Sequence, residues 1–137
     1  MASRRKAREV AVQILYQIDL SGEDPARAVE LYLENLGEQV NDDLEFARLL
    51  VTGCYAHLPE IDTKIGEASR HWRLPRMARV DRNILRLGTF ELLHLADVPR
   101  KVTLNESVEL AKRFGDENSA AFVNGVLDRL GSDLGKA

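Results

Sequence analysis

The sequence is poor in the features that mark secreted and membrane proteins. Cys54 is the single cysteine, which excludes an internal disulfide. No apolar run approaches the roughly 20 residues that a membrane-spanning helix needs. The first residues, Met-Ala-Ser-Arg-Arg-Lys-Ala-Arg, contain no apolar stretch with a small-residue cleavage site, so no secretory signal is expected. Together these features predict a cytoplasmic protein in a reducing compartment.

The sequence also lacks the usual motifs of catalytic sites. It contains neither a Gly-rich phosphate loop nor a Gly-x-Ser-x-Gly motif. His57, His71 and His94 are too far apart along the chain for a local pair of metal ligands. Cys54 lies in an apolar helical stripe, which indicates a buried small side chain rather than a nucleophile. We therefore expect a protein that is not an enzyme and holds no metal or cofactor.

The spacing of apolar residues predicts an all-α fold with about seven helices. Apolar positions recur every three or four residues along most of the 137-residue chain, and no stretch alternates long enough for a convincing strand. The expected helices run from Ser3 to Ser21, Asp24 to Gly37, Asp42 to Pro59, Ile61 to Leu74, Met77 to Leu95, Thr103 to Gly115 and Asn118 to Leu130. Residues 1–130 then form one domain, and residues 131–137 are expected to be a flexible tail.

The helix expected from Met77 to Leu95 has an unusually wide apolar face. Its apolar positions cover more than a third of the helical circumference, so we expect it to be the central helix. Glu91 falls on this apolar face. A buried carboxylate needs a partner, and the following loop offers Arg100 and Lys101.

Positive charge is concentrated at the N-terminus. Arg4, Arg5, Lys6 and Arg8 occur with no acid among the first eight residues, while the rest of the chain carries a net charge of −7. A short basic cluster on an acidic body suits local contact with a polyanion, and a solvated terminus explains it equally well.

Two further helical faces allow more than one interpretation. Arg79, Arg82 and Arg86 form a basic ridge on the expected central helix, which is either solvated or a nucleic-acid contact. Phe122 lies at the edge of the last helix, near Asn118, where it either packs or stacks on an unpaired base. Taken together, the basic terminus, the ridge and the aromatic favour single-stranded RNA binding.

The outer side of the first helix is also ambiguous. Val12 and Tyr16 point away from its main apolar stripe. They either pack against another part of the same protein or form a partner surface.

Several motifs resemble the NusB family of transcription antitermination factors. They are Arg4-Arg5-Lys6-Ala7-Arg8-Glu9, Gln13-Ile14-Leu15-Tyr16, Val80-Asp81-Arg82-Asn83-Ile84-Leu85-Arg86, Asp97-Val98-Pro99, Asn105-Glu106, Glu109-Leu110-Ala111-Lys112, Phe114-Gly115, Ser119 and Phe122-Val123-Asn124-Gly125-Val126-Leu127-Asp128. The resemblance covers residues 4 to 130. It implies seven helices in two packed bundles and no catalytic activity.

The resemblance also implies a function in transcription. Family members bind the boxA element of nascent ribosomal RNA together with the ribosomal protein NusE, and the complex helps RNA polymerase to pass terminators. By matching position, the implied RNA contacts are Arg4, Arg5, Lys6, Arg8, Arg86, Asn118 and Phe122, and the implied NusE contacts are Tyr16 and Asp81. The family often has an acid at the position of Asn118, so this chain lacks one repulsion toward phosphate.

Other functional classes remain open at this point. NusB-like domains also occur at the N-terminus of certain ribosomal RNA cytosine methyltransferases, although this chain is not expected to contain a cofactor domain as well. A protein-protein adaptor or homodimer in ribosome biogenesis would leave the basic terminus unused. A helix-turn-helix DNA reader would prefer duplex over single strands.

Overall fold

The computed structural model describes residues 4–36, 42–70 and 73–137, and within these ranges it contains helices and no strand. The helices are α1 (Arg4–Ser21), α2 (Pro25–Leu36), α3 (Asp42–Ala56), α4 (Leu58–Ser69), the short 3₁₀ helix η1 (Leu74–Arg76), α5 (Arg79–His94), α6 (Arg100–Phe114) and α7 (Ser119–Leu134). The expectations placed on Ser3, Gly37, His71 and Trp72 lie outside the described residues.

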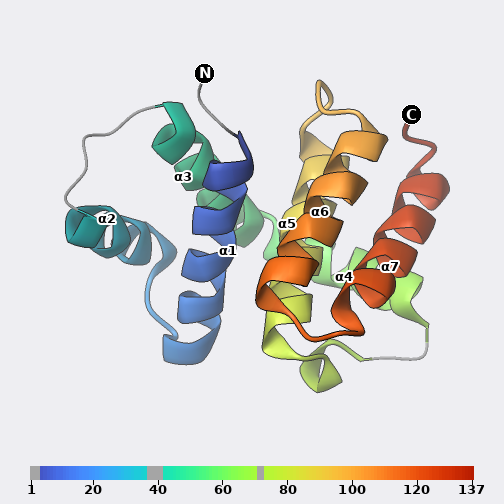
Figure 1. The fold of residues 1–137 in the computed structure, drawn as a ribbon, viewed down its shortest axis with the longest axis horizontal. Coiled ribbons are helices and arrows are strands. Elements are labelled where there is room, and N and C mark those ends of the chain that lie inside the picture. Colours follow the sequence, from blue (N-terminus) through green and yellow to red (C-terminus); the bar gives the residue numbers. More distant parts are fainter. Residues whose placement is uncertain (1–3, 37–41, 71–72) are drawn as a thin grey trace.

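The helices form two bundles that meet along α5. Helices α1 to α3 make one bundle and α4 to α7 the other, as Figure 1 shows. Helix α5 packs against α1 and α3 in the first bundle and against α4, α6 and α7 in the second. Residues along most of its length are buried, from Asp81 to Leu92 with the exception of Arg82. The all-α fold, its two bundles and the central place of this helix are confirmed.

Local signals set the first helix boundaries as expected. Helix α1 ends at Ser21, and Gly22 follows with φ +73°, a conformation that glycine adopts without strain. The Asp24 carboxylate then accepts a hydrogen bond from the Arg27 backbone N–H at 3.2 Å, and Pro25 occupies the first position of α2.

The expected start of the sixth helix and the expected end of the seventh were wrong. Helix α6 begins at Arg100, directly after Pro99, so Thr103 lies inside the helix rather than at its cap. Helix α7 continues through Gly131 to Leu134 and is capped by Gly135, which has φ +69° and donates its backbone N–H to the carbonyls of Gly131 and Ser132. The Lys136 ammonium then donates hydrogen bonds to backbone carbonyls at the end of α5, so the last residues contact the domain.

A glycine permits the close packing of α3 against α5. A Cβ atom at Gly53 would lie 2.3 Å from Cζ of Phe90, which is closer than carbon atoms can approach. The next residue, Cys54, is fully buried in the same contact. Burial raises the pKa of its thiol well above the ordinary range, so the nucleophilic thiolate is suppressed.

Cys54 should therefore be unreactive in the folded protein. We expect a disulfide reagent such as dithionitrobenzoate to label one thiol per chain in denaturant and almost none in native buffer near pH 8. Rapid native labelling, at the rate of a free thiol, would show that the α3–α5 contact opens readily.

Candidate nucleic-acid interface

Three exposed cations mark the start of α1. Arg4, Arg5 and Lys6 are all exposed. The Arg4 guanidinium lies over the Phe46 ring, 4.4 Å from its centroid. Cations in the first turn of a helix oppose its macrodipole, whereas an anion is favoured there. The three cations therefore reduce the stability of the helix slightly, which is typical of residues kept for binding an anion such as phosphate.

An ion pair holds Arg5 across the surface toward α6. Its Nε and Nη2 donate to the two carboxylate oxygens of Glu106 at 3.0 and 2.9 Å. Hydrogen bonding to Arg5 lowers the pKa of Glu106. The ion pair therefore stays formed at and above the ordinary pKa of a carboxyl group and is lost only as the pH falls through the lowered pKa. Arg5 and Glu106 also line an open hollow of about 490 Å³, together with Val98, Pro99 and Val102.

Arg8, another expected RNA contact, does not belong to this exposed cluster. It is only 3% exposed, because it faces the core from α1. Its Nη2 and Nε donate to Glu91 on α5 at 2.7 and 2.8 Å, and the Thr103 hydroxyl donates to the same carboxylate. The burial of Glu91 is confirmed, but its expected partners were wrong: Arg100 pairs with Asp128 instead.

Arg86, also expected to contact RNA, is likewise engaged in ion pairs inside the protein. Its guanidinium donates to both carboxylate oxygens of Asp62 on α4 at 2.9 and 3.0 Å. Its neighbour Arg82 donates to Asp19 on α1 at 2.7 Å. Burial opposes ionisation of Asp19, but hydrogen bonds from Arg82 and Asn83 outweigh it and lower the pKa of this carboxyl. The predicted arginine ridge is therefore largely an internal network of ion pairs.

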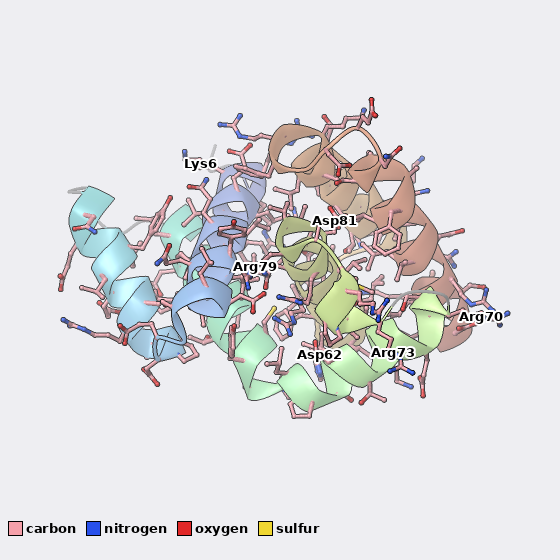
Figure 2. The ribbon with its side chains drawn as sticks, turned by 90° about the horizontal axis from the view of Figure 1, so that it is seen from below. Lys6, Asp62, Arg70, Arg73, Arg79 and Asp81 are labelled. Carbon is pink, nitrogen blue, oxygen red and sulfur yellow. The ribbon has the colours of Figure 1, made fainter. Side chains whose placement is uncertain are left out.

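Four exposed arginines lie instead between the end of α4 and the first residue of α5. Arg70, Arg73, Arg76 and Arg79 recur at every third position and are all exposed. Figure 2 shows Arg70, Arg73 and Arg79 on the face seen from below. We call these four residues the lower basic patch. Sequence reasoning assigned only Arg79 to a basic surface and missed the other three, although the regular spacing of four arginines without an intervening acid was visible.

Asn118 and Phe122 meet the lower basic patch at the start of α7. Asn118 is exposed and Phe122 is half-buried. They line a pocket of about 310 Å³ together with Arg76, Met77 and Asp81. A flat aromatic face beside a cation is a suitable surface for stacking a base and holding its phosphate.

The Asp81 carboxylate places an unpaired hydrogen-bond acceptor beside this pocket. The residue is 9% exposed, and its Oδ1 has no hydrogen-bond partner among the described residues. A buried carboxylate oxygen is costly without a donor, so the pocket suits a ligand or protein group that supplies one.

The two residues expected to contact NusE lie in different surroundings. Asp81 shares the pocket of Asn118 and Phe122, whereas Tyr16 lines a mainly apolar hollow of about 210 Å³ with Val80 and Phe114. Val12 also lines this hollow but is 2% exposed, so of the two alternatives for it, packing within the protein is confirmed.

Helix α6 connects the two candidate RNA-contact regions. Glu106 holds Arg5 at the middle of α6, and Asp116 lines the Phe122 pocket just beyond the end of α6. At 1.5 Å per residue, these positions are about 15 Å apart along the helix. About four or five nucleotides of a helically stacked strand cover this distance.

The histidines are closer together than their separation in the chain indicated. His57, at the α3–α4 turn, stacks on His94, the last residue of α5, with ring centroids 3.9 Å apart. His57 and His94 are far apart along the chain, as noted above, but the packing of α4 against α5 brings them together. Of the parts of the chain that the structure describes, none forms a helix long and apolar enough to cross a membrane.

These features define a small all-α protein of two helical bundles, with exposed cations at the start of α1 and in the lower basic patch. Residues 5–132 match the model of the NusB family, and the chain belongs to that family. It is 49% identical to the transcription antitermination protein NusB of Myxococcus xanthus, with 99% of each chain covered.

Solved structures of similar proteins have the same fold. NusB of T. maritima superimposes with a TM-score of 0.88 at 38% identity, covering 96% of this chain and 92% of that one. A chain from a crystal structure of the antitermination factors NusB and NusE in complex with dsRNA gives a TM-score of 0.87 at 34% identity, covering 95% and 96%.

Proposed function

We propose that this protein is a non-catalytic, cytoplasmic transcription antitermination factor that binds boxA RNA together with NusE. The observation that carries the proposal is the exposed group of Arg4, Arg5 and Lys6 at the N-terminus of α1, in a chain of the NusB family. The similar structure of NusB and NusE in complex with dsRNA supports NusE and an RNA as partners.

RNA binding follows from an exchange of ionic partners at α1. A phosphate replaces Glu106 on Arg5, while Arg4 and Lys6 contact neighbouring phosphates and release condensed counterions. These contacts carry no sequence information, so recognition requires base contacts elsewhere.

The pocket at the start of α7 supplies base contacts in this proposal. Phe122 stacks on an unpaired base, and Arg76 holds the adjacent phosphate. Asn118 is uncharged and so does not repel the RNA. Asp81 accepts a hydrogen bond from NusE at the margin of this pocket, and the Tyr16 hollow extends the NusE surface.

Fluorescence anisotropy with labelled boxA RNA tests the function. We expect saturable binding that becomes tighter when NusE is added, and weaker competition by a scrambled RNA, by the boxA duplex and by boxA DNA. Equal competition by duplex DNA, or no effect of NusE, would contradict the proposal. An effect of NusE without RNA selectivity would favour the adaptor alternative.

Tyr16 should separate the two partners. We expect Tyr16→Ala to reduce the effect of NusE on RNA affinity by about tenfold, equivalent to about 1.4 kcal/mol, because a half-buried aromatic is a typical interface anchor. Gln17→Ala, at the next exposed position of α1, is the matched control. If Tyr16→Ala instead weakens RNA binding without NusE, the hollow belongs to the RNA surface.

A further inference from the structure

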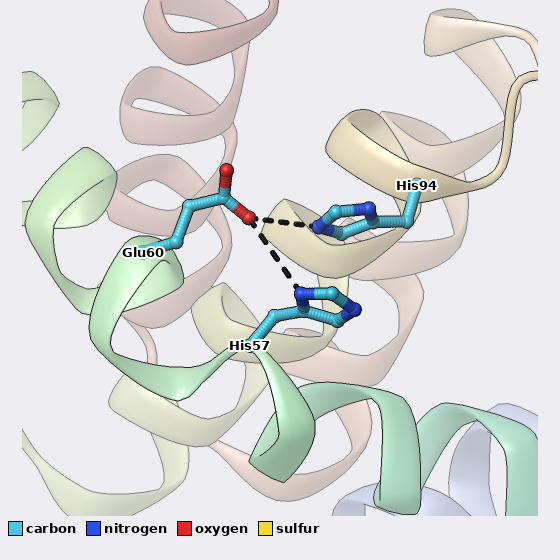
Figure 3. Close-up of side chains that lie close together, drawn as sticks. All are labelled: His57, Glu60 and His94. Carbon is cyan, nitrogen blue, oxygen red and sulfur yellow. Dashed lines mark hydrogen bonds and ion pairs between the residues drawn. The ribbon is translucent and has the colours of Figure 1, made fainter.

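Three potential metal ligands from distant parts of the chain meet at the start of α4 (Figure 3). His57 precedes α4, Glu60 lies in its first turn and His94 ends α5. His94 Nε2 is 2.8 Å from Glu60 Oε1, and His57 Nδ1 is 4.0 Å from the same oxygen. One ligand atom from each residue lies within 4.8 Å of the other two.

The two distances to Glu60 Oε1 are close to the ligand separations of a tetrahedral metal site. Ligand atoms 2.0 to 2.1 Å from a tetrahedral zinc ion are about 3.3 to 3.4 Å from one another. The two distances to Glu60 Oε1 lie on either side of this value, so each requires a change of about 0.6 Å. Side-chain rotation alone provides such changes at exposed residues.

A buried aromatic ring supports both imidazoles. The Phe90 ring centroid is 5.5 Å from that of His94 and 6.3 Å from that of His57. Phe90 is itself only 4% exposed and is held by its close contact with Gly53. The two histidines are thus confined on the protein side and open toward solvent.

We propose that His57, Glu60 and His94 bind a divalent transition-metal ion, with Zn²⁺ as the best fit. Two imidazoles and one carboxylate suit Zn²⁺, Ni²⁺ or Cu²⁺, whereas Mg²⁺ and Ca²⁺ prefer oxygen ligands alone. Because all three residues are exposed, water completes the coordination. This site shares no residue with the candidate RNA surface, and the inference does not rest on the proposed function.

Metal binding has a defined consequence for the two rings. They now stack with an interplanar angle of 24°, and they must tilt apart so that both nitrogen lone pairs point at one ion. The coordinating nitrogens, His57 Nδ1 and His94 Nε2, carry no proton in the complex, and each neutral ring keeps its proton on the other nitrogen. The ion then links the α3–α4 turn to the end of α5 and stabilises the folded state by mass action.

Calorimetric titration of ZnCl₂ into the full-length, untagged protein tests the site. We expect one equivalent to bind, and His57→Ala, His94→Ala and Glu60→Gln each to weaken the affinity by about tenfold or more. Glu67→Gln, an exposed carboxylate on the same helix that pairs with Lys64, is the matched control and should bind as the wild type does. Zn²⁺ should raise the melting temperature of the wild type and the control, and MgCl₂ should not.

Absorption spectra with CoCl₂ provide a second readout that depends on geometry. Intense visible bands in the wild type that are absent in His57→Ala and His94→Ala would support a tetrahedral site built from both rings. Melting curves without metal establish that each variant is folded. Equal Zn²⁺ affinity in the wild type and both histidine variants, or no saturable binding in the micromolar range, would overturn the proposal.

Discussion

Glu91→Ala should lower the free energy of unfolding by about 3 to 5 kcal/mol, because it leaves the guanidinium of Arg8 buried without a counterion. Both side chains of this pair are almost completely buried, at 4% and 2% exposure. The substitution also removes the acceptor of the Thr103 hydroxyl. Urea unfolding, followed by circular dichroism, measures the change.

Two comparisons make this result specific to the buried pair. Glu67→Ala, at an exposed ion pair of α4, should cost less than about 0.5 kcal/mol. Arg8→Met should also be strongly destabilising, whereas Arg8→Met combined with Glu91→Leu should recover much of the loss because no charge stays buried. A loss below about 1 kcal/mol for Glu91→Ala would mean that water reaches the pair in solution.

Phe122→Ala should weaken the binding of boxA RNA by about 1 to 3 kcal/mol, the range measured for base stacking on aromatic side chains. Phe122 is half-buried and lines the pocket that also contains Arg76 and Asn118. Its loss of stability should be smaller than the 3 to 5 kcal/mol typical of a fully buried phenylalanine. Anisotropy with folded protein gives the affinity, and urea unfolding gives the stability.

Conservative variants separate stacking from packing at this position. Phe122→Tyr keeps a flat ring and should keep most of the RNA affinity. Phe122→Leu keeps the apolar contacts with the bundle but has no flat ring, so it should be nearly as stable as the wild type and bind RNA weakly. Normal RNA binding by Phe122→Leu, with reduced stability, would make Phe122 a packing residue.

The fold was predictable because helix identity depends on local patterns. Apolar residues at every third or fourth position marked the seven α-helices found among the described residues, and the wide apolar face before Leu95 marked the central one. The boundary errors arose where the wrong local signal was chosen, Thr103 for the start of α6 and Gly131 for the end of α7. Helix α6 begins directly after Pro99, and α7 passes through Gly131 and ends before Gly135, so both boundaries had local signals in the sequence.

The candidate site was less predictable, because a helical wheel shows which side chains share a face but not what lies opposite. Arg8 resembles its basic neighbours in the sequence, yet it faces Glu91 on another helix. Arg86 belongs to an apparent basic ridge, yet Asp62 neutralises it. The lower basic patch is the exception, since its regular arginine spacing was available in the sequence.

The salt dependence of boxA RNA binding tests the central claim most directly, because the claim is that the exposed cations at the start of α1 bind phosphate. Arg4, Arg5 and Lys6 should together contribute about −2 to the slope of log affinity against log salt concentration, at about −0.7 per phosphate contact on a single strand. Replacing all three with alanine should flatten the slope by that amount. Replacing Arg27, Arg48 and Lys64, which removes the same net charge from α2, α3 and α4, should leave the slope nearly unchanged. An unchanged slope in the α1 variant, or equal flattening in both variants, would contradict this assignment.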